Sequence, residues 1–264
     1  MKKKIYFLSG LPRSGSTLLG SLLSQHPRIT VTPTSPLLDM MCYTNESINK
    51  LYGSYTFDKK TLEENVYKGI IGNFFDHIST DIVVDKHRGW PRNIKPVRMF
   101  IDDDPKIICT YRPVSEVVAS YIILIGRNGS QPNFVDDHLR TKALAATVEN
   151  RSRVLWESYI SDPYQSTVFG MNNCRKNMHF VAYGDLVSKP DEVMSGIYDF
   201  LGDVEPHKHS FGDIHNSCRE EKDAAWGLNH LHDIRPVLGR TSPSAREVLG
   251  EKLAAYFDRF NLDP

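Results

Sequence analysis

The stretch IYFLSGLPRSGSTLLGSLL, residues 5–23, decides the fold of this 264-residue chain. It opens with the continuously apolar run Ile5–Leu8, which is typical of a strand covered on both faces. The segment Gly10–Thr17 follows, and the leucines at 18, 19, 22 and 23 then share one face of a predicted helix. A strand, a glycine-containing loop and a helix in this order predict an anion-binding site. The reason is that the loop N–H groups turn inward and the positive end of the helix points at the same place.

The loop has the framework of a P-loop but lacks its lysine. The pattern requires Gly, four residues, Gly, Lys and then Ser or Thr, whereas here Ser16 stands at the lysine position. A nucleoside triphosphatase without that lysine loses its contact with the β- and γ-phosphates. Arg13 supplies the cationic charge instead, and Ser14 and Thr17 join Ser16 as hydroxyl donors. A plain structural turn is the alternative, but the strand before and the helix after favour a site for an anion other than a magnesium triphosphate.

A second strand-to-helix unit lies about a hundred residues further along the chain. The apolar run Ile107–Tyr111 ends in Arg112, and Pro113 can open the next helix. Ser120 lies about two helical turns beyond Arg112, so both side chains face the same way and can converge on a second phosphate. The alternative is a structural ion pair between Arg112 and Glu116 at the start of the helix.

Strand-like and helix-like segments alternate along the whole chain. Further apolar runs at Ile82–Val84 and His179–Tyr183 predict two more buried strands. Residues 135–160 have the composition of one long helix, and Ser244 with Glu247 can form a capping box at the start of the last helix. Such alternation predicts an α/β fold with a central parallel sheet flanked by helices on both faces.

Composition excludes several classes of protein. Lys+Arg and Asp+Glu both number 32, so the net charge of zero argues against a nucleic-acid-coating protein. No apolar run approaches the ~20 residues of a transmembrane helix, and the apolar part after Lys2–Lys4 is too short for a signal peptide. The four cysteines are widely separated and have no metal-like spacing, so we expect free thiols, a cytoplasmic location and no bound metal.

Three segments in sequence order resemble the sulfotransferase family. They are the loop Arg13–Thr17, the unit Arg112–Ser120, and Tyr183–Leu186 followed by a helix that ends in Phe200–Gly202. The resemblance covers residues 5 to 202 and implies a P-loop-like three-layer fold, with residues 1–264 as a single sulfotransferase domain. The loop and the trailing His26-Pro27 are most similar to the bacterial and tyrosylprotein sulfotransferase branches.

The resemblance also implies a donor and the residues that bind it. The donor is 3′-phosphoadenosine 5′-phosphosulfate (PAPS), which leaves as 3′-phosphoadenosine 5′-phosphate (PAP), and no metal takes part. The loop residues 13–17 (Arg13, Ser14, Gly15, Ser16, Thr17) would hold the 5′-phosphosulfate, with Arg13 and Ser16 receiving the negative charge that grows on the leaving oxygen. Arg112 and Ser120 would bind the 3′-phosphate, and Tyr183 would lie against the adenosine. Arg240 would replace the family's C-terminal phosphate contact, with Arg235 as the weaker alternative.

The catalytic base is the least determined residue. In the cytosolic branch a His after a central strand takes the acceptor proton, and here His87 follows the strand Ile82–Val84. Lys86 would then assist at the sulfuryl oxygens, although it is adjacent to His87 rather than two residues before it. In the tyrosylprotein branch the base is a Glu shortly after the first helix, where this chain has no carboxylate until Asp39. His87 as a solvent-exposed loop residue is an equal alternative.

The resemblance therefore implies in-line transfer of a sulfuryl group from PAPS to a hydroxyl or amine of a small-molecule or peptide acceptor. A P-loop kinase or nucleotide hydrolase, and a non-catalytic nucleotide-binding module, are the alternatives. The acceptor pocket is expected from residues 32–81, predicted as helices and loops over the sheet edge, from residues 126–129 and from the tail after Phe211, with Trp90 as a possible wall. The sequence predicts neither the acceptor nor the oligomeric state.

Overall fold

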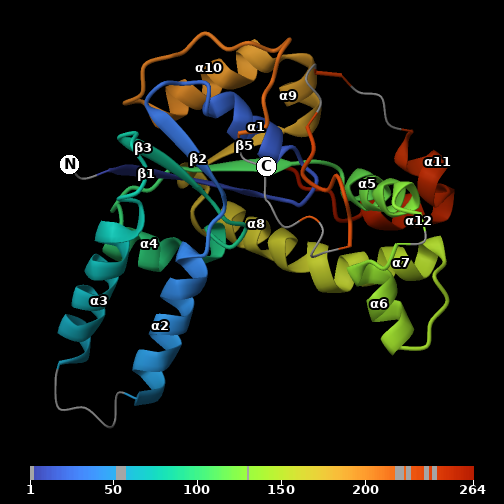
Figure 1. Cartoon of the computed structure of the whole chain (residues 1–264), viewed down its shortest axis with the longest axis horizontal. Coiled ribbons are helices and arrows are strands. Elements are labelled where there is room, and N and C mark those ends of the chain that lie inside the picture. The colour runs from blue at the N-terminus through green and yellow to red at the C-terminus, as the bar shows by residue number, and fades with distance from the viewer. Residues whose placement is uncertain are drawn as a thin grey trace.

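A computed structural model describes residues 3–51, 58–129, 131–217, 223, 227–234, 238–239 and 243–264. Within these ranges the chain forms a five-stranded parallel sheet in the order β2-β3-β1-β4-β5 (Figure 1). The strands are β1 (Lys4–Gly10), β2 (Ile29–Thr34), β3 (Ile82–Lys86), β4 (Ile107–Tyr111) and β5 (Met178–Ala182). This sheet confirms the predicted α/β fold. Because β1 is central, the loop after it opens between the carboxyl ends of β3 and β4, where open parallel sheets place their ligands.

Helices cover both faces of the sheet. The α-helices of the described chain are α1 (Ser16–Leu23), α2 (Leu37–Leu51), α3 (Lys59–Phe74), α4 (Ile94–Phe100), α5 (Val114–Arg127), α6 (Phe134–Thr141), α7 (Val148–Leu155), α8 (Ser161–Asn173), α9 (Tyr183–Ser188), α10 (Pro190–Leu201), α11 (Ala245–Leu249) and α12 (Glu251–Asp258). Helices α1, α9 and α10 lie on one face, while α4 and α8 lie on the other (Figure 1). The result is the expected three-layer arrangement.

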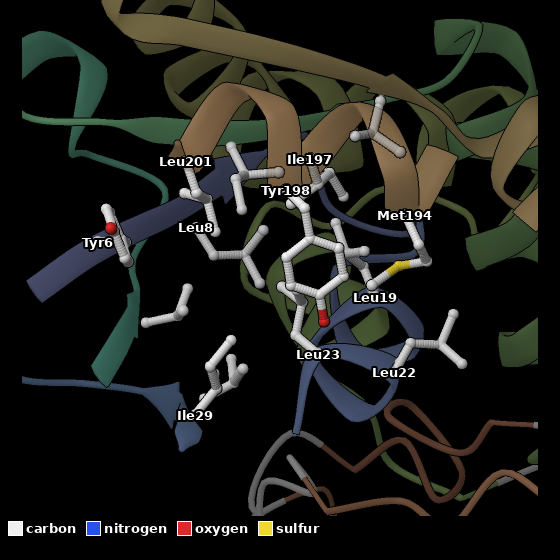
Figure 2. Packing of buried hydrophobic residues seen from close by; sticks show 14 of the residues in the cluster. Tyr6, Leu8, Leu19, Leu22, Leu23, Ile29, Met194, Ile197, Tyr198 and Leu201 are labelled. Carbon is white, nitrogen blue, oxygen red and sulfur yellow. The ribbon is translucent and has the colours of Figure 1, made fainter. Parts of the chain in front are cut away.

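The alternation of side chains along β1 builds the two main cores. Tyr6 and Leu8 point to one face and pack with α1 and α10, as Figure 2 shows. Ile5 and Phe7 point to the opposite face and pack with α2, α4 and Trp90. Successive side chains of a strand alternate between faces, so a continuous apolar run is what a strand covered on both sides requires. A third cluster joins α5, α7, α11 and α12.

Two helix predictions need correction. Residues 135–160 do not form one helix: α6 ends at Thr141, and Thr147 caps a new helix by accepting the N–H of Asn150 at 3.2 Å. From there α7 continues through a π-helical turn into α8. The last helix begins with the predicted Ser244–Glu247 capping box but is interrupted at Gly250, whose φ of 78° ends α11 before α12 begins.

Residues 32–81 hold α2 and α3, as expected, but also complete a strand that the prediction missed. β2 is an edge strand, and its pairing with β3 shifts register between Val31 and Thr34, around Pro33. Proline is tolerated at edges and irregularities because it has no N–H to donate, and its presence hid the strand in the sequence. Across the described ranges, none of the helices combines the length and the apolar character needed to cross a membrane.

Candidate active site

One cavity collects most of the predicted site residues at the carboxyl end of the sheet. It has a volume of about 480 Å³. The glycine loop, the end of β3, one face of α5, the start of α9 and residues 230–234 line it. Eight of the predicted residues contribute: Arg13, Gly15, Ser16, Thr17, Lys86, Arg112, Ser120 and Tyr183. The two motifs that the sequence places a hundred residues apart therefore meet in the same cavity.

The glycines of the loop are required by its backbone. Gly15 has a φ of 91°, and a Cβ there would lie 2.8 Å from the ring of Tyr183. Gly10 has a φ of 131°, and a Cβ there would lie 2.0 Å from the carbonyl oxygen of Thr110. Gly15 is the N-cap residue of α1. Because it has no side chain, it cannot accept a hydrogen bond from the N–H groups of the first turn. This geometry suits an anion at the start of α1.

Ser14 differs from its predicted role as a hydroxyl donor to the ligand. Its side chain is fully buried, and its hydroxyl lies 2.5 Å from the carbonyl oxygen of Leu11 and 2.7 Å from the hydroxyl of Thr110. It does not line the cavity. The side chain instead ties the loop to the end of β4, because a hydroxyl inside a turn binds nearby backbone groups.

Arg13 lines the cavity but does not point where the prediction placed its charge. Its Nε donates to the hydroxyl of Ser120 at 3.2 Å, and its Nη1 donates to the carbonyl oxygen of Leu231. Burial lowers the pKa of the Arg13 guanidinium from its usual value, yet arginine remains protonated in proteins. The guanidinium thus lies on the α5 side of the cavity, beside the residue predicted to bind the 3′-phosphate.

Arg112 forms the ion pair of the structural alternative and also lies on the wall of the cavity. Its Nε donates to Glu116 Oε2 at 2.9 Å, the ion pair of the structural alternative. The same guanidinium lines the cavity and lies 4.4 Å from the centre of the Tyr183 ring. The ion pair holds Arg112 in place, and the cation–π contact joins it to Tyr183. Arg112, Ser120 and Tyr183 come together as predicted.

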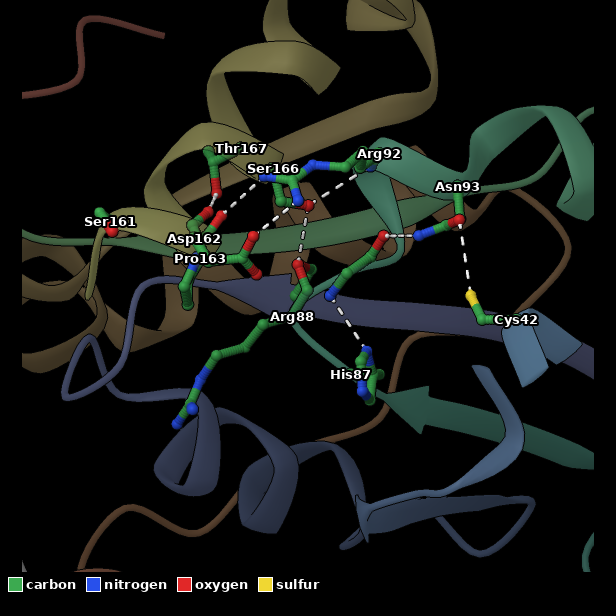
Figure 3. Close-up of polar contacts among 12 residues, drawn as sticks. Cys42, His87, Arg88, Arg92, Asn93, Ser161, Asp162, Pro163, Ser166 and Thr167 are labelled. Carbon is green, nitrogen blue, oxygen red and sulfur yellow. Dashed lines mark hydrogen bonds and ion pairs between the residues drawn. The ribbon is translucent and has the colours of Figure 1, made fainter. Parts of the chain in front are cut away.

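The end of β3 directs successive side chains to opposite sides. Lys86 and Arg88 line the cavity, and Lys86 Nζ donates to the hydroxyl of Thr17 at 3.5 Å. His87 lies between them in the chain, and its N–H still donates to Leu8 in β1 at 3.0 Å, so the extended pairing reaches this residue. The His87 ring is outside the cavity lining and extends in another direction from the side chain of Arg88 (Figure 3).

The surroundings of His87 bring the two predicted base candidates together. The N–H of Gly89 donates to His87 Nδ1 at 3.1 Å, and Nε2 lies 3.5 Å from Oδ1 of Asp39. Because Nδ1 accepts, the neutral ring carries its proton on Nε2, toward the carboxylate. Burial lowers the pKa of His87, and the Asp39 carboxylate opposes this shift. In the neutral imidazole, Nδ1 is the only nitrogen that can accept a proton, and its lone pair already accepts the N–H of Gly89.

Trp90 is not a pocket wall, contrary to the sequence-based expectation. It is fully buried, and its Nε1 donates to Asp85 Oδ2 at 3.0 Å. Asp85 is also fully buried and accepts the hydroxyl of Thr32 at 3.3 Å. Burial raises the pKa of Asp85 to about 6. These contacts tie β2, β3 and the Trp90 turn together beneath the site.

Sequence reasoning gave Arg88 no role, and it expected residues 126–129 and the tail after Phe211 in the acceptor pocket rather than in this cavity. Arg88 and Arg127 line the cavity. Arg88 lies two residues beyond β3, in a turn that no strand pattern covers, whereas the seven-residue spacing of Arg127 from Ser120 on α5 could have indicated its direction. The strap, residues 228–234, packs between two cores: Leu228 and Leu231 lie in the cluster of α5, and Ile234 packs against the cluster of α1. The apolar residues of the strap recur at every third position, and this spacing is the sequence signal that could have indicated its packing. Arg235 and Arg240 lie outside the described residues.

Comparisons with known proteins agree with this fold. The profile described as Sulfotransferase family matches residues 6–204. The sulfotransferase domain from the curacin biosynthetic pathway is similar, with a TM-score of 0.50, 19% identity and coverage of 98% of this chain and 97% of that chain. Mouse sulfotransferase SULT7A1, solved in complex with PAP, is similar with a TM-score of 0.56, 14% identity and coverage of 98% and 84%. No curated protein sequence matches.

Proposed function

This chain belongs to the sulfotransferase family, and from that premise we propose that it transfers the sulfuryl group of PAPS. Sulfuryl transfer is the family's reaction, which leaves the kinase, hydrolase and non-catalytic alternatives without support. Ser16 in place of the P-loop lysine also counts against the kinase and hydrolase. The identity of the donor is the part that this proposal adds.

The charge of the cavity is the observation that carries the proposal. Its described lining holds five cationic side chains and a single carboxylate, that of Asp233. The cations are Arg13, Lys86, Arg88, Arg112 and Arg127. They are spread from the loop at one end to α5 at the other, which suits one ligand with phosphate groups at two separate positions. A mononucleotide with a single phosphate group would leave part of this charge unused.

The arrangement supports a definite orientation of the donor. The loop amides and the start of α1, with the hydroxyls of Ser16 and Thr17, would hold the 5′-phosphosulfate. Ser120 and Arg112 would bind the 3′-phosphate, and Arg13, hydrogen-bonded to Ser120 at 3.2 Å, would join them rather than the leaving oxygen. Tyr183 would lie against the adenosine. Arg240 stays a prediction.

The reaction we propose is an in-line displacement at sulfur. The acceptor oxygen or nitrogen forms a bond to sulfur while the bond between sulfur and the bridging oxygen breaks, and its electron pair stays with departing PAP. Lys86 and Ser16 would stabilise the charge that develops there. Positioning supplies much of the rate, as in phosphoryl transfer.

We propose Asp39 as the group that takes the acceptor proton, with His87 as its positioning residue. This reverses the order that the sequence favoured. The reason is the hydrogen bond from Gly89 to His87 Nδ1, which leaves the ring able to donate but not to accept. The exposed carboxylate of Asp39 faces Nε2 of His87 and retains oxygens for an acceptor hydroxyl or amine.

The rest of the predicted organisation belongs to the same proposal. We propose that residues 1–264 act as one domain on a small-molecule or peptide acceptor, and that the enzyme works in the cytoplasm. The described cysteines, Cys42, Cys109 and Cys174, are free thiols, which supports a reducing compartment. The tyrosylprotein-like branch remains a prediction.

Calorimetric titration tests the choice of donor. We expect PAP to bind, and PAP to be released from PAPS in the presence of a panel of phenols, alcohols and amines. Tight binding of magnesium-ATP without detectable binding of PAP would refute the proposal. Binding of PAP without sulfate transfer to any acceptor would point to a nucleotide-binding protein that has lost its activity.

A further inference from the structure

The loop of this protein has no cation of its own at its mouth. Ser16 stands where a P-loop has lysine, and the guanidinium of Arg13 is directed to Ser120 and Leu231. A sulfuryl group in transfer spreads negative charge over its oxygens, and catalysis depends on cations or N–H donors placed to meet that charge. The charge at the mouth of the loop must therefore come from another element.

Arg88 is placed to supply it. Its side chain lines the same cavity as Ser16, Thr17 and Lys86. Within the described part of the chain, the Arg88 guanidinium makes no hydrogen bond and no ion pair. Its backbone is held firmly, since the carbonyl oxygen accepts hydroxyls from Ser9 and Ser166 at 3.0 Å each. Figure 3 shows the side chain extending away from these contacts.

The two residues that hold Arg88 are themselves buried. Ser9 in β1 is 3% exposed and Ser166 in α8 is 1% exposed. Buried hydroxyls that donate to one carbonyl from two different elements fix the position of the chain at that point. The structure therefore fixes the backbone of residue 88 and leaves its guanidinium available to a ligand.

We propose that Arg88 is a catalytic residue that binds the transferred sulfuryl group. This proposal rests on the proposed use of PAPS. Lys86 and Arg88 leave the end of β3 on the same side, and Lys86 reaches Thr17 at the first turn of α1. The planar guanidinium can offer two parallel N–H donors to two sulfuryl oxygens, and it remains protonated throughout the reaction. Arg88 and Lys86 would thereby supply together the charge that the loop lacks, with Arg88 on the sulfuryl oxygens.

Arg127 provides a matched control. It too lines the cavity, and within the described residues its side chain makes no hydrogen bond or ion pair. It lies seven residues beyond Ser120 on α5, about 10 Å further along that helix at 1.5 Å per residue. A variant at Arg127 removes the same charge from the same cavity without removing it from the mouth of the loop.

The pair of ligands PAPS and PAP isolates the sulfuryl group. The phosphosulfate carries one negative charge on each of its two groups, and the 5′-phosphate of PAP carries about 1.5 to 2 near neutral pH. The two ligands thus have similar total charge. A cation that acts only through the general field of the cavity affects both alike, whereas a cation in contact with the sulfuryl group affects PAPS more.

The experiment measures the affinity of PAPS and PAP for the wild type, Arg88→Met and Arg127→Met, with intact PAPS verified after each titration. We expect Arg88→Met to weaken PAPS binding by roughly ten- to a hundredfold, the loss of a charge-assisted hydrogen bond, and PAP binding by less than about threefold. Arg88→Lys should restore part of the PAPS affinity. Arg127→Met should change the two affinities by similar factors.

Each outcome decides a different point. Equal losses for PAPS and PAP in Arg88→Met, or no loss for either, would overturn the role of Arg88 while leaving the proposed donor intact. Failure of the wild type to bind PAP would instead overturn the proposed function, and the role of Arg88 with it. Thermal unfolding of the variants checks their folding, and we expect no change because the Arg88 guanidinium makes no hydrogen bond or ion pair with the described residues.

Discussion

Replacing Arg112 by alanine should separate the 3′-phosphate from the rest of the donor. The guanidinium lines the cavity beside Ser120 and is held by Glu116 at 2.9 Å, so it is positioned before the ligand arrives. A charge-assisted hydrogen bond contributes about 1.5–3 kcal/mol. Arg112→Ala should therefore weaken PAP binding by roughly 10- to 160-fold. The Arg112 contact with Tyr183 is worth about 0.5–1 kcal/mol, so adenosine 5′-phosphate, which lacks the 3′-phosphate, should lose only a few-fold.

Isothermal calorimetry with both nucleotides measures this difference directly. Tyr183→Leu is the control, because a ring that serves the adenosine should affect PAP and adenosine 5′-phosphate by similar factors. Equal losses for the two nucleotides in Arg112→Ala would mean that Arg112 does not bind the 3′-phosphate. The Glu116 ion pair would then be its whole function, and the proposed orientation of the donor would fall.

Three further predictions concern the base, the glycine loop and the stability of the fold. Asp39→Asn should lower the rate of PAP release with the acceptor panel by roughly 10²–10⁴-fold and leave PAP affinity unchanged. His87→Gln should lower this rate less. If His87→Gln lowers the rate more than Asp39→Asn, His87 is restored as the base. Gly15→Ala, strained at a φ of 91°, should destabilise the fold and weaken PAP binding at least about tenfold, whereas Gly184→Ala, with open space around its Cβ, should do neither. Burial raises the pKa of Asp85 to about 6, so the folded state retains a proton that the unfolded state releases from about pH 4 upward. The proton on Asp85 therefore stabilises the folded state fully below about pH 4, and this stabilisation is lost as the pH rises through 6. The free energy of unfolding should change by about 3 kcal/mol, which urea unfolding should detect in the wild type but not in Asp85→Asn.

The layout of the donor cavity could be predicted because its signals are local. Glycines at 10 and 15, a strand before them and a helix after them define the loop wherever they occur. Helical spacing places Ser120 on the same side as Arg112, and the structure brings both to the loop. In these segments the local patterns of strand, turn and helix all agree with the parallel sheet that brings the two segments together.

The remaining roles depended on contacts that sequence spacing does not contain. Ser14 was expected to face the ligand, but whether a loop hydroxyl turns in or out depends on Thr110, nearly a hundred residues away. The direction of Arg13 depends on the carbonyl oxygen of Leu231 in the strap, more than two hundred residues away, and no local pattern connects these two residues. Trp90 is buried because its ring packs against Phe7 in the core, and its indole N–H is satisfied there by Asp85.

The end of β3 shows how one residue of register changes a functional assignment. The sequence Lys86-His87-Arg88 draws attention to the histidine, because imidazole titrates near neutral pH. A strand alternates its side chains, so a residue between two that face the cavity must face elsewhere. His87 N–H pairs with Leu8 and so extends the alternation one residue past β3, with the ring beside Asp39 and with Lys86 and Arg88 on the cavity. In the proposed mechanism, charge stabilisation by Lys86 and Arg88 and proton transfer at Asp39 would therefore belong to different sides of these three residues.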